Sequence, residues 1–172
     1  RYGFDGIDID WEYPGGGGLE QNGIGDTATD GDNYVLLLRA LRDELNKQTL
    51  IDGKTYYLSI AGPGGDTNIS RMDPKKIAGI VDWINIMTYD FHGGWDSMTG
   101  LNAPMVNVDP NVGAAKWSVA GATEVYLTGL NGKGGVPASQ LVLGVPFYGR
   151  GWNNVEAGAS GTGLGQAGSA GT

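Results

Sequence analysis

The opening fourteen residues alternate apolar and acidic side chains with a period of two, which fits a β-strand and no helix. Because successive side chains of a strand point to opposite faces, Asp8, Asp10 and Glu12 share one face, while Ile7 and Ile9 share the other. Carboxyl groups on one face are about 6 to 7 Å apart, so they interact once water is excluded. The sequence therefore predicts a strand with one chemical face and one packing face.

The three carboxyl groups on this face cannot all stay ionised at low cost, so at least one is expected to hold a proton near neutral pH. Glu12 is the candidate for such a general acid, because it stands next to the proline- and glycine-rich break at 14–18. Reactive groups of α/β enzymes lie at the carboxyl ends of strands. Asp10 is expected just beneath Glu12 and Asp8 deeper, whereas Asp5 has the opposite parity and is expected to support the strand start.

Two other interpretations of the acidic residues stay open. A solvated strand face is disfavoured because Phe4 and Gly6 share the parity of the acids, and glycine mixed with acids is a poor composition for such a strand. Carboxylate oxygens also suit a divalent cation, which would make the chain a structural metal protein. The acidic loop at 15–31 lacks the spacing of a calcium-binding EF-hand loop and is expected to be a surface connection.

The composition excludes several classes of binding partner and of metal site. A net charge of -8 argues against nucleic acid and against an anionic membrane, and it is compatible with a neutral ligand such as a sugar polymer. The absence of cysteine excludes disulfides and thiolate metal sites, and a single histidine, His92, excludes a multi-histidine zinc site. The sequence has no apolar run long enough to span a bilayer. A domain seldom begins inside its catalytic strand, so the sequence is expected to be part of a longer chain.

The rest of the chain predicts helices and strands in alternation, which is typical of a parallel sheet. Helices are expected at 32–46, with Asp32 or Asn33 as the N-cap, at 73–81 and at 118–130. Strands are expected at 56–61, 83–90 and 141–147, and the last is apolar throughout, as buried parallel strands are. A further turn is expected to start at 109–110. The tail at 157–172 has almost nothing to bury and predicts a flexible loop or linker.

Three motifs resemble glycoside hydrolase family 18, the chitinases. Residues 5–12 (DGIDIDWE) resemble the Asp-x-x-Asp-x-Asp-x-Glu signature of the fourth strand of its barrel. Residues 87–90 (MTYD) resemble the Met-x-Tyr-Asp motif of the sixth strand, and 147–152 (FYGRGW) resemble the ending of the seventh. The resemblance implies an α/β fold, namely a partial (β/α)8 TIM barrel with approximately strands 4 to 7 at 1–156. It also implies that 157–172 begins an α+β insertion.

The same resemblance implies a reaction: hydrolysis of β-1,4 linkages between N-acetylglucosamine units of chitin, assisted by the substrate's own acetamido group. Glu12 would be the acid and then the base. Asp10 would hold the acetamido N–H, Asp8 would tune Asp10, and Tyr89 would position the acetamido oxygen. No metal or cofactor is implied.

Substrate contacts are assigned by the resemblance, and by the suitability of aromatic faces for sugar rings, to Met87, Asp90, Trp95, Tyr148 and Arg150. Arg150 can bond to substrate or pair with an acid, and both alternatives stay open. Trp11, Trp83 and Trp117 are assigned to packing, and His92 to a surface or packing position without a chemical role.

The expected partners are chitin or N-acetylglucosamine oligosaccharides, without nucleic acid or membrane. The sequence gives no oligomeric state, and the resemblance implies secretion to the extracellular space. A chitin-binding lectin is disfavoured, because non-catalytic relatives typically lose the terminal acid, whereas Glu12 and Asp10 are both present. An endo-β-N-acetylglucosaminidase acting on N-glycans shares the acidic signature, but Trp95 and the Gly-Arg-Gly-Trp ending favour chitin.

Overall fold

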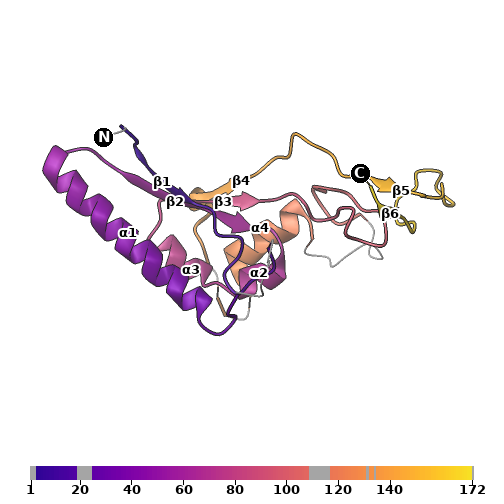
Figure 1. The fold of residues 1–172 in the computed structure, drawn as a ribbon. Helices are drawn as coiled ribbons and strands as arrows, with labels where there is room; N and C mark the ends of the chain where they lie inside the picture. Colours follow the sequence, from indigo (N-terminus) through magenta and orange to yellow (C-terminus); the bar gives the residue numbers. More distant parts are fainter. Residues whose placement is uncertain (1–2, 19–24, 109–116, 131, 134, 172) are drawn as a thin grey trace.

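The computed structural model describes residues 3–18, 25–108, 117–130, 132–133 and 135–171. Strands and helices alternate along most of this chain (Figure 1). The elements are, in order, β1 (Gly6–Ile9), α1 (Asp30–Asp52), β2 (Tyr57–Pro63), α2 (Asp66–Ser70), α3 (Pro74–Ala78), β3 (Trp83–Met87), α4 (Val119–Thr128), the 3-10 helix η1 (Ala138–Gln140), β4 (Leu141–Leu143), β5 (Trp152–Asn153) and β6 (Ser169–Ala170).

Strands β1 to β4 form one parallel sheet in sequence order. Asp8 pairs with Ser59 across β1 and β2, and Ile60 pairs with Ile84 across β2 and β3. Helices α1 to α4 lie together on one side of this sheet (Figure 1). The α/β fold predicted from the sequence is confirmed.

The hydrophobic core lies between the sheet and these helices. Its fully buried strand residues alternate with residues that point to the opposite face of the sheet, as the period of a strand requires. The most deeply buried side chains are Leu58, Ile60, Ile84 and Ile86 from the strands, and Leu38, Ile77 and Tyr126 from the helices. The hydroxyl of Tyr126 donates to the Pro63 carbonyl at 3.0 Å, which fastens α4 to the carboxyl end of β2.

The first helix is longer than predicted. The N-cap expected at Asp32 or Asn33 is wrong, because α1 already begins at Asp30 and continues to Asp52. It ends at Gly53, whose φ of 72° is readily available to glycine. The apolar residues of α1 that recur at helical spacing face the core: Val35 and Leu38 are buried, and Leu41 and Leu45 pack against it.

Two later helices have side-chain caps at their amino ends. The Asp73 carboxylate accepts the N–H of Lys76 at 3.1 Å, and the Ser118 hydroxyl accepts the N–H of Gly121 at 3.1 Å. The two helices end a few residues earlier than predicted, at 78 and 128. Helix α2 was not predicted, because five residues show too little periodicity to be recognised. The turn expected at 109–110 lies outside the described residues. No helix in the described part of the chain has the length and apolar character needed to cross a membrane.

Three strand predictions need correction. The strand expected at 83–90 is shorter, since β3 ends at Met87. Strand β2 runs through Gly62 instead of stopping there; a Cβ at this position would lie 2.6 Å from the Tyr126 hydroxyl, so glycine is needed for packing and not for a turn. Strand β4 ends at Leu143 and is not buried, since Val142 and Leu143 remain 48% and 44% exposed. Among the described residues no further strand pairs with the outer edge of β4.

The glycine-rich tail is held by backbone bonds. Strand β6 in the tail pairs antiparallel with β5, and the Thr99 N–H donates to the Gln166 carbonyl at 2.9 Å. The Gly168 N–H also donates to the carbonyl of Ser97 at 3.0 Å. The flexible linker expected from composition is therefore not observed, because the peptide groups of the tail hold it against the rest of the chain. The domain boundary at 156/157 stays a prediction.

Candidate active site

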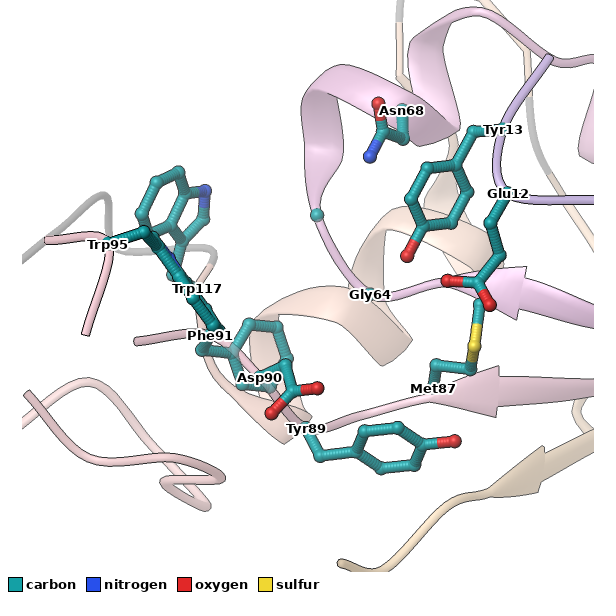
Figure 2. A pocket seen from close by; sticks show the side chains of 11 residues that line it. Glu12, Tyr13, Gly64, Asn68, Met87, Tyr89, Asp90, Phe91, Trp95 and Trp117 are labelled. Carbon is teal, nitrogen blue, oxygen red and sulfur yellow. The ribbon is translucent and has the colours of Figure 1, made fainter. Parts of the chain in front are cut away.

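A pocket of about 190 Å³ lies at the carboxyl ends of the first three strands (Figure 2). Glu12 follows β1, Gly64 follows β2 and Met87 ends β3. The residues that line the pocket are Glu12, Tyr13, Gly64, Gly65, Asn68, Met87, Tyr89, Asp90, Phe91, Trp95 and Trp117. The carboxyl ends of parallel strands are where α/β folds place their ligand sites.

Glu12 reaches the pocket from just beyond β1. Figure 2 shows its carboxylate beside the Tyr13 hydroxyl and the Met87 side chain. The Tyr13 hydroxyl is hydrogen-bonded to Glu12; burial first and this bond second raise the pKa of Tyr13. Glu12 is exposed in the described chain, so its carboxyl group can meet a ligand.

Tyr89 shares the electrostatic surroundings of the predicted acids. Burial raises the pKa of its hydroxyl most, and the charges of Glu12, Asp10 and Asp90 raise it further. A Cβ at Gly144 would lie 2.7 Å from the Tyr89 ring, so the chain after β4 packs directly against this ring. The structure thus brings Tyr89 close to Glu12 and Asp10, although Asp10 itself does not line the pocket.

Asp8 lies on the same face of the sheet but outside the pocket. Its carboxylate accepts hydrogen bonds from the Ser59 hydroxyl and, at 3.1 Å, from the Asn85 amide. The Asn85 side chain in turn accepts the indole N–H of Trp83 at 3.2 Å. Asp5 is exposed just before β1, and its backbone carbonyl accepts the N–H of Tyr57 at 2.9 Å. Asp8 thus lies farther from the pocket along β1 than Glu12, but it is exposed and not deeply buried, whereas Asp5 lies at the strand start as predicted.

Asp90 is paired with Arg150. Two guanidinium nitrogens, Nε and Nη2, donate to its two carboxylate oxygens at 2.8 Å each, in the bidentate geometry that arginine and carboxylate favour. The guanidinium centre also lies 5.0 Å from the Trp95 ring centre and 5.1 Å from that of Tyr148. Of the two alternatives left open for Arg150, the structure shows pairing with an acid. Tyr148 and Arg150 do not line the pocket. They contact residues that do: Arg150 lies against Trp95, and the ring centres of Tyr148 and Tyr89 are 6.2 Å apart.

This pair predicts a pH effect on stability. The hydrogen bonds from Arg150 hold the pKa of Asp90 below its usual range. Because the folded-state pKa is below the unfolded value, the pair stabilises the fold above about pH 4, and this contribution is lost as the pH falls through the lowered pKa. Asp90→Asn should therefore lower the Tm of the complete domain at pH 7, and the difference from wild type should shrink as the pH falls below about 4. About a third of each side chain is exposed, so an effect of ~1 kcal/mol or less is expected. Thermal melts across this range check it, and a pH-independent difference would contradict it.

Several pocket residues were missed by the sequence analysis. Tyr13 was not recognised because β1 ends at Ile9, so strand alternation no longer decides where residues beyond it point. Asn68 belongs to the unpredicted α2, although the glycine-rich stretch at 62–65 after β2 is a signal that could have marked this wall. Trp117, assigned to packing alone, also lines the pocket. The packing assignment of Trp11 is confirmed by its edge contact with Tyr34, with ring centres 5.3 Å apart.

No three histidine, aspartate or glutamate side chains in the described segments gather in a way that could hold a metal ion. The pocket lining offers two carboxyl groups, of which that of Asp90 is paired with Arg150, together with phenol hydroxyls, an amide, a thioether and aromatic rings.

Comparison with known proteins identifies relatives over nearly the whole chain. The profile described as Glycosyl hydrolases family 18 matches residues 1–171. Chitinase A1 of Niallia circulans is 46% identical over 159 residues, which are 89% of this chain and 22% of that protein. Chitinase ChiA74 from Bacillus thuringiensis superposes with a TM-score of 0.85 at 43% identity, over 96% of this chain and 25% of that one.

A third relative is described as a family 18 N-acetylglucosaminidase from Paenibacillus barengoltzii. It has a TM-score of 0.82 at 30% identity and covers 97% of this chain and 47% of its own. The chain thus spans between about a fifth and just under half of the length of these three relatives, and its four parallel strands match part of the barrels of the two solved structures. The matched profile and the two chitinases together show that this chain belongs to glycosyl hydrolases family 18 and covers part of the catalytic domain.

Proposed function

We propose that the complete protein hydrolyses β-1,4 linkages between N-acetylglucosamine units of chitin. The observation that carries the proposal is the convergence of Glu12 and Tyr89, from the ends of two different strands, on one pocket. Family membership and the two chitinase relatives support the same reaction.

In the first step of the proposed reaction, the acetamido oxygen of the sugar attacks the anomeric carbon of the same sugar. The glycosidic C–O bond breaks, and Glu12 gives its proton to the leaving oxygen. Tyr89 would donate a hydrogen bond to the acetamido oxygen and hold it in line, and Asp10 would accept the acetamido N–H and stabilise the positive oxazolinium ion. Asp8 would orient Asp10 from beneath, a role supported by its fixed bonds to Ser59 and Asn85.

In the second step, Glu12 is a carboxylate and takes a proton from water as the water oxygen attacks the anomeric carbon. The oxazolinium ring opens to the acetamide, and the glutamic acid is restored for the next turnover. Two successive displacements at the same carbon leave its configuration retained.

The lining of the pocket supports a neutral sugar as the ligand. Trp95, Phe91 and Trp117 form its wall away from Glu12, and apolar ring faces suit the CH faces of pyranose rings (Figure 2). The net charge of -8 disfavours an anionic polymer.

Incubation of the full-length protein with N-acetylglucosamine oligosaccharides and with chitin tests the proposal. We expect shortened oligosaccharides whose new reducing ends are first released as the β-anomer, which proton NMR detects. Release of the α-anomer would contradict the retaining mechanism, and binding without hydrolysis would identify a lectin. An alternative function is N-acetylglucosaminidase activity, which is the activity given for the Paenibacillus barengoltzii relative. In that case, monosaccharide would be the only early product.

A further inference from the structure

A buried histidine lies behind Trp95, outside the residues that the proposed reaction uses. His92 is only 7% exposed, and its Nδ1 lies 3.3 Å from a carboxylate oxygen of Asp96. An ionised carboxylate only accepts hydrogen bonds, so Nδ1 is the donor. The same Asp96 oxygen accepts the Gly93 N–H at 3.1 Å, and the Asp96 N–H donates to the Gly93 carbonyl at 2.8 Å. These bonds close a turn at 93–96, called here the Trp95 turn.

The Trp95 turn and the His92 ring behind it are held by contacts with other segments. The indole N–H of Trp152 donates to the Asp96 carbonyl at 3.0 Å. The His92 ring packs against Trp117, with ring centres 5.6 Å apart, and a Cβ at Gly100 would come within 2.3 Å of the imidazole. The imidazole therefore fills a closed space between the turn, Trp117 and the loop at 97–102.

Trp95 depends on this turn for its position. Its side chain is 61% exposed, so burial does little to hold it. The ring lies directly over Gly93, where a Cβ would be 2.3 Å from it, and Arg150 lies at 5.0 Å. Figure 2 shows Trp95 at the far side of the pocket from Glu12. A solvent-exposed ring provides a stacking surface at low entropic cost only when its backbone is already fixed.

We propose that His92 is a positioning residue: through Asp96 it fixes the Trp95 turn and so holds Trp95 as a stacking surface for a sugar unit at the side of the pocket away from Glu12. This inference rests on the proposed function. It assigns to His92 a contribution to the binding of oligosaccharides and none to the bond-breaking step.

Two substitutions in the full-length protein separate the hydrogen bond from the bulk of the side chain. His92→Leu is similar in size but has no donor, whereas the amide of His92→Asn places a donor where Nδ1 stands. For an N-acetylglucosamine hexasaccharide, we expect His92→Leu to raise KM about 3- to 10-fold with kcat within about twofold, and His92→Asn to restore KM. In a Trp95→Ala background, His92→Leu should have no further effect, since the residue acts through that ring. Additive effects of the two substitutions, or a loss confined to kcat, would overturn the proposal.

Hydrogen–deuterium exchange of residues 92–97 provides a readout that needs no substrate. We expect faster exchange in His92→Leu and not in His92→Asn. Val35→Ala, a truncation in the core under α1, is the matched control: it should lower the Tm yet leave both KM and this exchange unchanged. Unchanged exchange in His92→Leu would reject the role of His92 even if the wild type hydrolyses chitin. If the wild type hydrolyses no oligosaccharide, the proposed function is rejected, and so is the role of His92 in sugar binding. The exchange experiment would still decide whether His92 holds the turn.

Discussion

Glu12→Gln in the full-length protein should lower kcat on N-acetylglucosamine oligosaccharides by about 10²- to 10⁴-fold. Glutamine has the same shape as glutamic acid and can keep the hydrogen bond with the Tyr13 hydroxyl. It has no proton to give to the leaving oxygen and cannot take one from water. Because the pocket keeps its shape, the affinity for a hexasaccharide, measured by calorimetry, should change less than about threefold.

The matched control for this substitution is Glu44→Gln. Glu44 lies on the solvent face of α1, where it pairs with Lys47, and it has no contact with the pocket. The same chemical change there should leave kcat and KM unaltered. Wild-type turnover by the Glu12 variant would remove the acid from the proposed mechanism, and equal losses in both variants would show that the effect is not specific to the pocket.

The opening stretch of the sequence shows how far strand alternation predicts a site. Alternation correctly placed Asp8 opposite the core, on the face that also carries Ser59 and Asn85. It also led to Glu12 as the candidate for the pocket. It did not lead to Tyr13, because β1 ends at Ile9 and the chain then turns, so that two consecutive side chains enter the same pocket. The two-residue period predicts side-chain directions only within a strand. Here the pocket residues lie beyond the end of the strand, where the period no longer applies.

Contacts between residues far apart in the sequence were the other feature that could not be predicted from it. The Asp90 and Arg150 pair joins residues 60 positions apart, and no local pattern distinguishes an arginine that binds substrate from one that binds a carboxylate. The tail was misjudged for a related reason. Its small side chains have little to bury, but its peptide groups bond to the segment at 97–99, and composition carries no information about such bonds.

At the amino ends of β2 and β3, away from the pocket, Arg42 of α1 joins three segments. Its Nε donates to the Ile80 carbonyl at 3.0 Å, and one terminal nitrogen donates to the Tyr56 carbonyl at 3.0 Å. The other terminal nitrogen forms an ion pair with Asp82, whose carboxylate also accepts the Leu58 N–H at 2.7 Å. One guanidinium therefore satisfies acceptors before both central strands and holds α1 against them.

Arg42→Met should lower the free energy of unfolding of the complete catalytic domain by about 2 to 3 kcal/mol. Methionine keeps the length and helix propensity of the side chain, but the carbonyls of Ile80 and Tyr56 and the carboxylate of Asp82 lose their common donor. The expected cost is kept to this range because the Asp82 side chain is 38% exposed and water replaces part of what is lost. Urea denaturation should show a lower midpoint with an unchanged slope. Lys47→Met on the same helix removes an ion pair exposed to solvent on both sides and should leave the midpoint where it is; equal shifts in the two variants would mean that the bonds of Arg42 to the strand ends do not stabilise the fold.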